Sequence, residues 1–207
     1  MSPGWRTSTR DVWQTAISAW CHHPAIFHRL GKYILAASFK SRFFRASTPK
    51  PEFDGRTSRR FILKMGGAQA GLATLQWRSL EKVAGVCEAH GRQLRAVLHE
   101  LGFATLGDPA EGEVCVAPRV SFLVESRQDA VAYFGAKGID LGQWFDGPLS
   151  PVPSSPLFNY QVGRHPVAEK VAKHVVNLPS HSRISSADLA HMVASLREFA
   201  RDSIHDQ

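Results

Sequence analysis

HPVAEKVAKHVVNLPSH, residues 165–181, combines two kinds of structure between a pair of prolines. Proline is well placed in the first turn of a helix, where its missing N–H costs nothing, so Pro166 indicates a helix start. The apolar residues that follow recur at helical spacing and mark a buried side: Ala168, Val171, Ala172 and Val175. The next residues, VVNLP, read as a short strand. We therefore predict a helix from Pro166 that leads directly into a strand.

The three histidines of this stretch do not form a metal-binding pattern. His165, His174 and His181 are nine and seven residues apart. His174 and His181 would share a helix face only if the helix crossed Pro179, and proline is not tolerated in a helix interior. We expect no shared metal ion and interpret the stretch as framework.

A compact strand, helix, strand unit is predicted upstream of this stretch. Alternating apolar residues indicate a strand over 120–124. Ser126 with Asp129 forms a capping-box variant that opens a helix, which stops at Gly138. The following residues 139–145, IDLGQWF, are predicted to return as a second strand.

A loop and a last helix flank the opening stretch. Residues 147–164, GPLSPVPSSPLFNYQVGR, contain four prolines and are predicted to be irregular. Long loops inside compact domains are usually functional, disordered or part of an interface. Ser185 with Asp188 is predicted to cap the last helix. The buried side of that helix is formed by Leu189, Met192, Val193, Leu196 and Phe199.

A long helical pattern precedes all of these elements. Its apolar positions keep three-to-four spacing, at Leu72, Leu75, Leu80, Val83, Cys87, Leu94, Val97, Leu98 and Leu101. Gly102 lies where such a helix would end. Three glycines each weaken an isolated helix by about 1 kcal/mol relative to alanine, namely Gly71, Gly85 and Gly91. We predict one long helix that is either held by packing or bent.

The positive charge of the 207-residue chain is concentrated at one end. The net charge is +7, but residues 1–64 hold twelve Lys and Arg against three acidic residues, and residues 65–207 hold thirteen against fifteen. We therefore predict two parts that meet near Met65: a basic amphipathic helical segment with a linker over 1–64, and the long helix with a small α/β domain over 65–207.

The basic part is predicted to be helix, break, helix. Trp13, Ile17 and Trp20 recur at helical spacing, Pro24 interrupts, and a second apolar series follows at Phe27, Leu30, Ile34, Leu35, Phe39 and Phe43. Residues 47–60 form a linker rich in proline, glycine and charge. Three interpretations remain open for the helices: a membrane-surface segment, a nucleic-acid-binding arm, or helices that pack on a larger body with a solvated cationic face.

Neither the cysteines nor the histidine-rich run near the start of the chain predicts a metal centre. Cys21, Cys87 and Cys115 are far apart and lack CxxC spacing. The run CHHPAIFH, residues 21–28, has no second Cys/His cluster at finger spacing. No apolar run reaches the roughly 20 residues that span a bilayer, and no signal-peptide pattern follows the first charges. We expect a reducing, cytoplasmic compartment.

Three segments resemble the DegT/DnrJ/StrS family of sugar aminotransferases. MGGAQAGLATLQWRSLE, residues 65–81, is similar to the family segment in which Met, Gln-Ala and a later Gln open a long helix. SRQDAVAYFGAKGI, residues 126–139, resembles its Arg-Asp helix before a Gly-Ile turn. The opening stretch resembles its Pro-x-Ala-Glu helix leading to Leu-Pro-x-His. The segments occur in family order and cover about residues 60–200.

The resemblance implies an α+β fold: the small C-terminal domain of a fold-type-I aminotransferase, with a long connecting helix and an N-terminal helical segment. It implies pyridoxal phosphate (PLP) as cofactor, held by a lysine, and amino transfer from glutamate or glutamine to a keto sugar on a nucleotide. It also implies a homodimer, or a companion chain that carries the lysine domain. The family places that lysine upstream of the matched segments, in a Ser/His-rich turn that none of Lys32, Lys40, Lys50 and Lys64 matches. We expect no transamination by this chain alone.

One departure from the family pattern affects the cofactor site. The family often has Gly-x-Asn-x-Arg-Met before the long helix, where the asparagine reaches the cofactor phosphate of a neighbouring subunit. Here RRFILKM, residues 59–65, places Ile62 and Lys64 at the asparagine and arginine positions. Ile62 has no hydrogen-bond donor, whereas Lys64 offers positive charge to a phosphate. Lys64 is therefore the one predicted cofactor-binding residue.

Two other functions compete with this one. The excess charge of residues 1–64 is typical of a noncatalytic module that binds an anionic membrane surface or nucleic acid. A self-contained enzyme using His181 or Asp140 is disfavoured, because the sequence shows no nucleophile, base and orienting group at the spacing of a catalytic set.

Overall fold

The computed structural model describes residues 5–23, 26–41, 56, 64–143, 147–149 and 159–205. The chain divides into two compact units, Met1–Arg78 and Ser79–Gln207. The division falls between the two helices into which residues 67–100 fold, whereas the change in charge lies near Met65.

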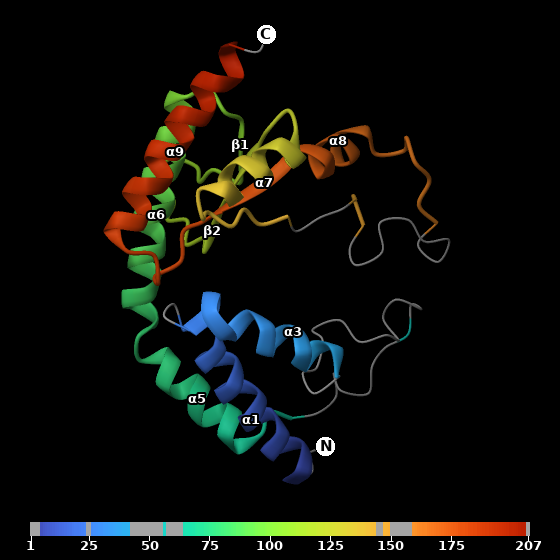
Figure 1. The fold of residues 1–207 in the computed structure, drawn as a ribbon, viewed down its shortest axis with the longest axis vertical. Coiled ribbons are helices and arrows are strands. Elements are labelled where there is room, and N and C mark those ends of the chain that lie inside the picture. Colours follow the sequence, from blue (N-terminus) through green and yellow to red (C-terminus); the bar gives the residue numbers. More distant parts are fainter. Residues whose placement is uncertain are drawn as a thin grey trace. The chain divides into compact units, whose positions relative to one another are not determined.

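The first unit is a set of short helices (Figure 1). In chain order they are α1 (Trp5–Cys21), the π-helical turn η1 (Phe27–Gly31), α3 (Lys32–Lys40) and α5 (Gly67–Trp77). The predicted break after the first helix is present, since α1 ends at Cys21; Pro24 and most of the predicted linker 47–60 lie outside the described residues. Helix α1 packs against η1, α3 and α5.

The core of the first unit is very small. Cys21 and Leu35 are its buried apolar residues among those described, with Ile17, Phe27 and Ile34 packed around them. Gly31 allows η1 to cross α1 closely, because a Cβ at this position would collide with the carbonyl oxygen of Cys21.

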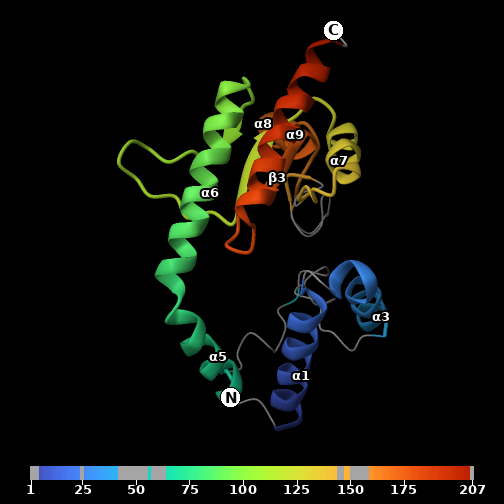
Figure 2. The same ribbon diagram turned by 60° about the vertical axis from the view of Figure 1, so that its left-hand side comes forward.

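The second unit is a three-stranded antiparallel sheet with helices (Figure 2). Its elements are α6 (Leu80–Glu100), β1 (Thr105–Leu106), β2 (Arg119–Leu123), α7 (Arg127–Ala136), α8 (Pro166–His174), β3 (Val175–Pro179) and α9 (Ser186–His205). The strand order is β1-β2-β3, and β2 pairs with β3 from Arg119 opposite Pro179 to Leu123 opposite Val175.

The core of the second unit lies on one face of this sheet. Alternate strand residues, Val120 and Phe122 on β2 and Val176 and Leu178 on β3, pack with side chains of α6, α7 and α9. Helices α6 and α9 lie side by side in both ribbon views and are joined at their surface by Arg197 and Glu100 at 3.0 Å. The predicted buried residues Leu189, Met192 and Leu196 belong to this core, while Val193 and Phe199 are partly buried against it.

The local helix signals are confirmed. The Ser126 hydroxyl accepts from the Asp129 N–H at 3.2 Å, and Ser185 and Asp188 exchange hydrogen bonds in the reciprocal pattern of a capping box. Pro166 is the first residue of α8, and β3 follows directly. Gly102 and Gly138 end their helices with positive φ angles of 79° and 76°.

The predicted long helix is not continuous: the chain leaves the helix at Arg78 and Ser79 between α5 and α6, which agrees with the bent alternative. One expectation about regular structure is wrong. IDLGQWF does not form a strand: only Gly142 pairs, as an isolated bridge to Asn177, and residues 144–146 lie outside the described part. Strand β1, two residues long, was not predicted.

Candidate functional site

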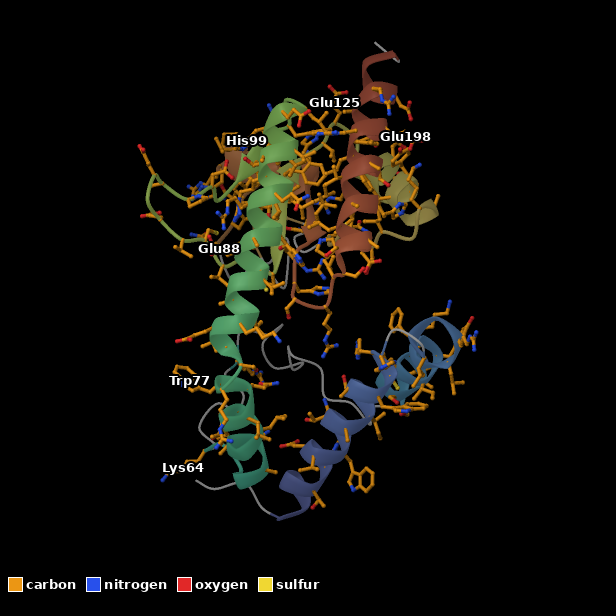
Figure 3. The ribbon with its side chains drawn as sticks, turned by 90° about the vertical axis from the view of Figure 1, so that its left-hand side faces the viewer. Lys64, Trp77, Glu88, His99, Glu125 and Glu198 are labelled. Atoms are coloured by element: carbon orange, nitrogen blue, oxygen red, sulfur yellow. The ribbon has the colours of Figure 1, made fainter. Side chains whose placement is uncertain are left out.

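Lys64, the predicted cofactor-binding residue, lies just before α5 and is exposed (Figure 3). Gly66 precedes the helix in an extended conformation, and its N–H donates to Oε1 of Gln69 at 3.0 Å. This contact fixes the first turn of α5, whose unpaired N–H groups carry partial positive charge. Lys64 thus adds a full charge to a helix end that already attracts anions. Ile62, the other departure from the family pattern, lies outside the described residues.

Helix α5 itself has no buried residue and exposes large apolar side chains. Trp77 is 75% exposed and Leu75 is 62% exposed, and Leu72 and Met65 are also exposed. Figure 3 shows Trp77 pointing away from the helix. Contiguous exposed apolar side chains often mark an interaction site.

Glu169 organises the start of the opening stretch. One of its carboxylate oxygens accepts hydrogen bonds from the Tyr160 hydroxyl at 2.8 Å and from the N–H groups of Gly163 at 2.8 Å and His165 at 3.3 Å. The Tyr160 hydrogen bond is the main reason that the pKa of Glu169 is lowered. Burial is the larger cause of the raised pKa of Tyr160, and the Glu169 carboxylate raises that pKa further. Glu169 therefore works as a structural tie between the end of the loop and α8.

The three histidines of the stretch have separate surroundings. His165 stacks on the ring of Tyr160, with ring centroids 6.2 Å apart. Nδ1 of His174 lies 2.9 Å from the carbonyl oxygens of both Val124 and Glu125. Among the described residues, no three His, Cys, Asp or Glu side chains are grouped as metal ligands.

His181 lies in a basic neighbourhood. Its Nδ1 accepts a hydrogen bond from the N–H of Arg183 at 3.3 Å. Although the residue as a whole is exposed, partial burial of the imidazole lowers its pKa, and the positive charges of Arg119 and Arg183 lower it further. His181 is therefore mainly neutral at neutral pH. We find no nucleophile hydrogen-bonded to it in the described part of the chain.

Arg127 and Lys173, from the start of α7 and the end of α8, line an open cavity of about 470 Å³. The remaining lining residues are Gln128, Val131, Gln143 and Ala172. Arg127 is the arginine of the family-like segment 126–139, and the structure places Lys173 in the lining of the same cavity. Nothing in the sequence distinguishes Lys173, because a lysine in the last turn of a helix is common.

The described lining of this cavity does not fit a pyridoxal phosphate group. Among the residues that the structure describes, a lysine and an arginine line it, but neither a carboxylate for the pyridine nitrogen nor an aromatic ring against the cofactor does. Lys137 lies at the end of α7, away from this cavity's lining. Its Nζ donates a hydrogen bond to Glu198 at 2.8 Å, and this hydrogen bond raises the pKa of the lysine amine. A lysine held protonated in this way is a poor nucleophile.

A polar cluster on α6 was not predicted. Arg95 is 8% exposed, and its guanidinium lies 3.0 Å from Sγ of Cys115 and 3.6 Å from Asp108. Asp108 also receives hydrogen bonds from His99 and Thr105. The one sequence signal for this cluster is Gly91, one turn before Arg95. A larger residue at this position would crowd the guanidinium, because its Cβ would lie 3.1 Å away. The cluster ties the 107–118 segment to α6.

Comparisons with known proteins agree with the resemblance. The sequence profile of the DegT/DnrJ/EryC1/StrS aminotransferase family matches residues 45–197. No curated protein sequence matches the chain. The described part contains no helix long and apolar enough to cross a membrane.

Solved structures share the fold. A DegT DnrJ EryC1 StrS aminotransferase from Brucella abortus has 23% identity over 64% of this chain and 35% of its own, with a TM-score of 0.56. S. venezuelae DesV, in complex with a ketimine intermediate, has 23% identity over 64% and 36%, with a TM-score of 0.55. The PMP form of Spr1654 from Streptococcus pneumoniae has 13% identity over 67% and 36%, with a TM-score of 0.57.

The chain thus spans about a third of the length of the solved structures it matches. At these identities the structural likeness establishes the fold of the matched part, and the profile match over most of the chain establishes the family. The chain belongs to the DegT/DnrJ/EryC1/StrS aminotransferase family.

Proposed function

We propose that this chain works as the C-terminal portion of a PLP-dependent nucleotide-sugar aminotransferase. In the complete enzyme the reaction transfers an amino group from glutamate or glutamine to a keto sugar attached to a nucleotide. The observation that carries this proposal is the family match over residues 45–197, together with the shared fold. The second unit, with its sheet and its buried core, serves as the small domain that closes over the active site.

The cofactor lysine of this proposal belongs to polypeptide outside these 207 residues. Two features of the described residues support it: the cavity beside Lys173 lacks the groups that PLP requires, and Lys137 is held by Glu198. PLP supplies the electron-accepting ring when it is bound, and this chain contributes surrounding surface. Lys64 is the residue proposed to place a cation near the cofactor phosphate of a neighbouring subunit.

A protein partner is part of the proposal. The apolar face of α5, with Leu72, Leu75 and Trp77, lies inside the family-matched residues and has no cover within the described residues of its unit. It fits either a second copy of the chain or a companion chain with the lysine domain. A reducing compartment, the cytoplasm, is consistent with the free thiols of Cys21, Cys87 and Cys115.

A borohydride experiment tests where the cofactor is held. The purified chain is incubated with PLP, treated with borohydride and digested, and the peptides are examined by mass spectrometry for a lysine that carries the reduced cofactor. We expect no stoichiometric lysine adduct and no transamination of glutamate by the chain alone. One specifically labelled lysine together with turnover would contradict the proposal.

A chimera tests whether this chain works as the C-terminal portion of an aminotransferase. S. venezuelae DesV contributes the portion that this chain does not cover, and this chain contributes residues 65–207. We expect the chimera to bind PLP and to form the same oligomer as DesV. A second chimera, with the equivalent portion of Spr1654, is the matched control for a foreign domain of low identity. If the control chimera binds PLP and ours does not, the domain is not a working aminotransferase portion.

A further inference from the structure

Helix α1 exposes an apolar face to solvent. Val12, Trp13, Ala16, Ala19 and Trp20 recur at three-to-four spacing and are all exposed; we call them the aromatic face of α1. Trp13 is 61% exposed and Trp20 is 48% exposed. Tryptophan is one of the largest apolar side chains, so exposure of two on one helix face is unusual for a surface that meets only water.

The packed side of α1 is mixed in character. The polar residues Arg10, Asp11, Gln14 and Ser18 are half-buried, as is Ile17, and Cys21 is buried. A surface helix usually turns its whole apolar stripe toward the core, whereas here Ile17 packs inward while Trp13 and Trp20 of the same stripe are exposed. The packing of α1 within its unit therefore does not account for the aromatic face.

Exposed cations accompany this face in the same unit. Lys32 and Lys40 lie at the two ends of α3 and are exposed, and so is Arg29. Nζ of Lys32 lies 5.0 Å from the ring centroid of Tyr33, which is itself 62% exposed. Residues 1–64 as a whole carry nine more positive than negative charges. This charge favours an anionic partner over a second copy, which would bring like charges together.

The aminotransferase family does not explain the aromatic face. The family match begins at residue 45, after α1, η1 and α3, whereas the apolar face of α5 lies within it. A nucleic acid is less suitable than a lipid surface, because Val12, Ala16 and Ala19 offer neither charge to a phosphate nor a ring to a base.

We propose that the aromatic face of α1 docks on an anionic lipid bilayer. Tryptophan and tyrosine prefer the boundary between acyl chains and headgroups, where the ring is in an apolar medium and its polar atom is solvated. Valine and alanine of the same face enter the acyl region, while the lysines of α3 and the remaining excess charge are attracted to anionic headgroups. The helix lies along the surface, and the chain is bound peripherally.

Vesicle sedimentation of the full chain tests this proposal. We use vesicles of phosphatidylcholine with phosphatidylserine and vesicles of phosphatidylcholine alone. We expect binding to the mixed vesicles, much weaker binding to the neutral ones, and loss of binding as added salt screens the charges. In the double variant Trp13→Ala, Trp20→Ala, the apparent affinity for mixed vesicles falls roughly tenfold or more.

Val167→Ala is the control. Val167 is a 76% exposed apolar residue, but it lies on α8 in the second unit, so its removal leaves vesicle binding unchanged. Protection of the Cys21 thiol from alkylation, measured by peptide mass spectrometry, shows whether the double variant keeps the packing of its unit. A second variant, Lys32→Glu with Lys40→Glu, weakens binding to mixed vesicles and not to neutral ones.

Three results would overturn the proposal. The first is equal vesicle binding by the wild type and a double variant that protects Cys21. The second is tighter binding to an oligonucleotide, with displacement from vesicles by it. The third is a self-associated form, seen in sedimentation velocity, that the double variant abolishes while neither protein binds vesicles. None of these results bears on the aminotransferase proposal, which concerns residues 65–207.

Discussion

Ser121 and Asn177 face each other across the β2–β3 pair, and the Ser121 hydroxyl donates a 2.5 Å hydrogen bond to Oδ1 of Asn177. The amide group of Asn177 donates to the carbonyl of Gly142 at 3.1 Å. The backbones of Asn177 and Gly142 exchange two further hydrogen bonds, of 3.0 and 2.9 Å. One buried asparagine thus joins both strands to the segment before the proline-rich loop.

We predict that Asn177→Ala lowers the free energy of unfolding by about 1–3 kcal/mol, because it leaves partly buried polar groups without their partners. Ser121→Ala costs less, about 1 kcal/mol, since only one hydrogen bond is lost. Urea unfolding followed by circular dichroism measures both. The double variant costs less than the sum of the single ones if the residues are coupled. An unchanged urea midpoint for Asn177→Ala would show that these hydrogen bonds do not hold the sheet edge.

Gly31→Ala is predicted to disrupt the first unit. Its Cβ collides with the backbone carbonyl of Cys21, and a backbone atom cannot swing aside as a flexible side chain does. We expect faster alkylation of the buried Cys21 thiol in this variant. Gly71→Ala is the control in the same unit: it lies in α5 with open space around it and stabilises that helix by up to about 1 kcal/mol. Equal alkylation rates in both variants would contradict the close crossing.

Arg95→Lys is predicted to loosen the 107–118 segment. A lysine cannot span both Cys115 and Asp108 as the planar guanidinium does, and the site is buried. Limited proteolysis should cut this segment faster in the variant than in the wild type. Arg92→Lys, at an exposed pair with Glu88 one turn away, is the control and should change unfolding by less than about 0.5 kcal/mol.

The second unit is predicted to lose stability in acid through its carboxylates. Hydrogen bonds from Tyr160, Ser185 and Lys137 lower the folded-state pKa values of Glu169, Asp188 and Glu198 respectively. A lowered folded pKa means that the unfolded chain binds protons first, so this stability is present above the ordinary values of 4.5 and 3.8 and is lost as pH falls through the folded values. The free energy of unfolding, measured across this pH range, should show this loss of stability.

Glu169→Gln separates one of these carboxylates from the others. The glutamine keeps the size of the side chain but does not titrate, so the variant should be less stable than the wild type near neutral pH and lose less of its stability in acid. An acid-unfolding profile that runs parallel to that of the wild type would rule out the role given to Glu169.

His181 extends the acid sensitivity to higher pH. Its folded pKa is lowered by burial and by Arg119, so the unfolded state binds a proton first as pH falls below the ordinary value of 6.5. His181→Gln should therefore lose less stability than the wild type between neutral pH and the carboxylate range. A steeper loss of stability in the variant would mean that folding raises the pKa of His181 instead of lowering it.

Features whose physical cause lies within a few residues could be predicted from the amino-acid sequence alone. The caps at Ser126 and Ser185, the helix start at Pro166 and the left-handed ends at Gly102 and Gly138 follow from local hydrogen bonding and φ preference. The family resemblance rested on the same kind of local motif and was confirmed by the match over 45–197.

Tertiary structure decided the remaining features, because their partners are distant in sequence. Thr105–Leu106 is a strand only because β2 lies beside it, and Gly142 is a single bridge because Asn177 fixes that edge. The cluster around Arg95 and the cavity lined by Arg127 and Lys173 likewise depend on how the elements pack. Periodicity predicted that α1 has an apolar stripe, but which side faces solvent depended on the helices beside it, since hydrophobic pattern does not say whether a partner covers a face.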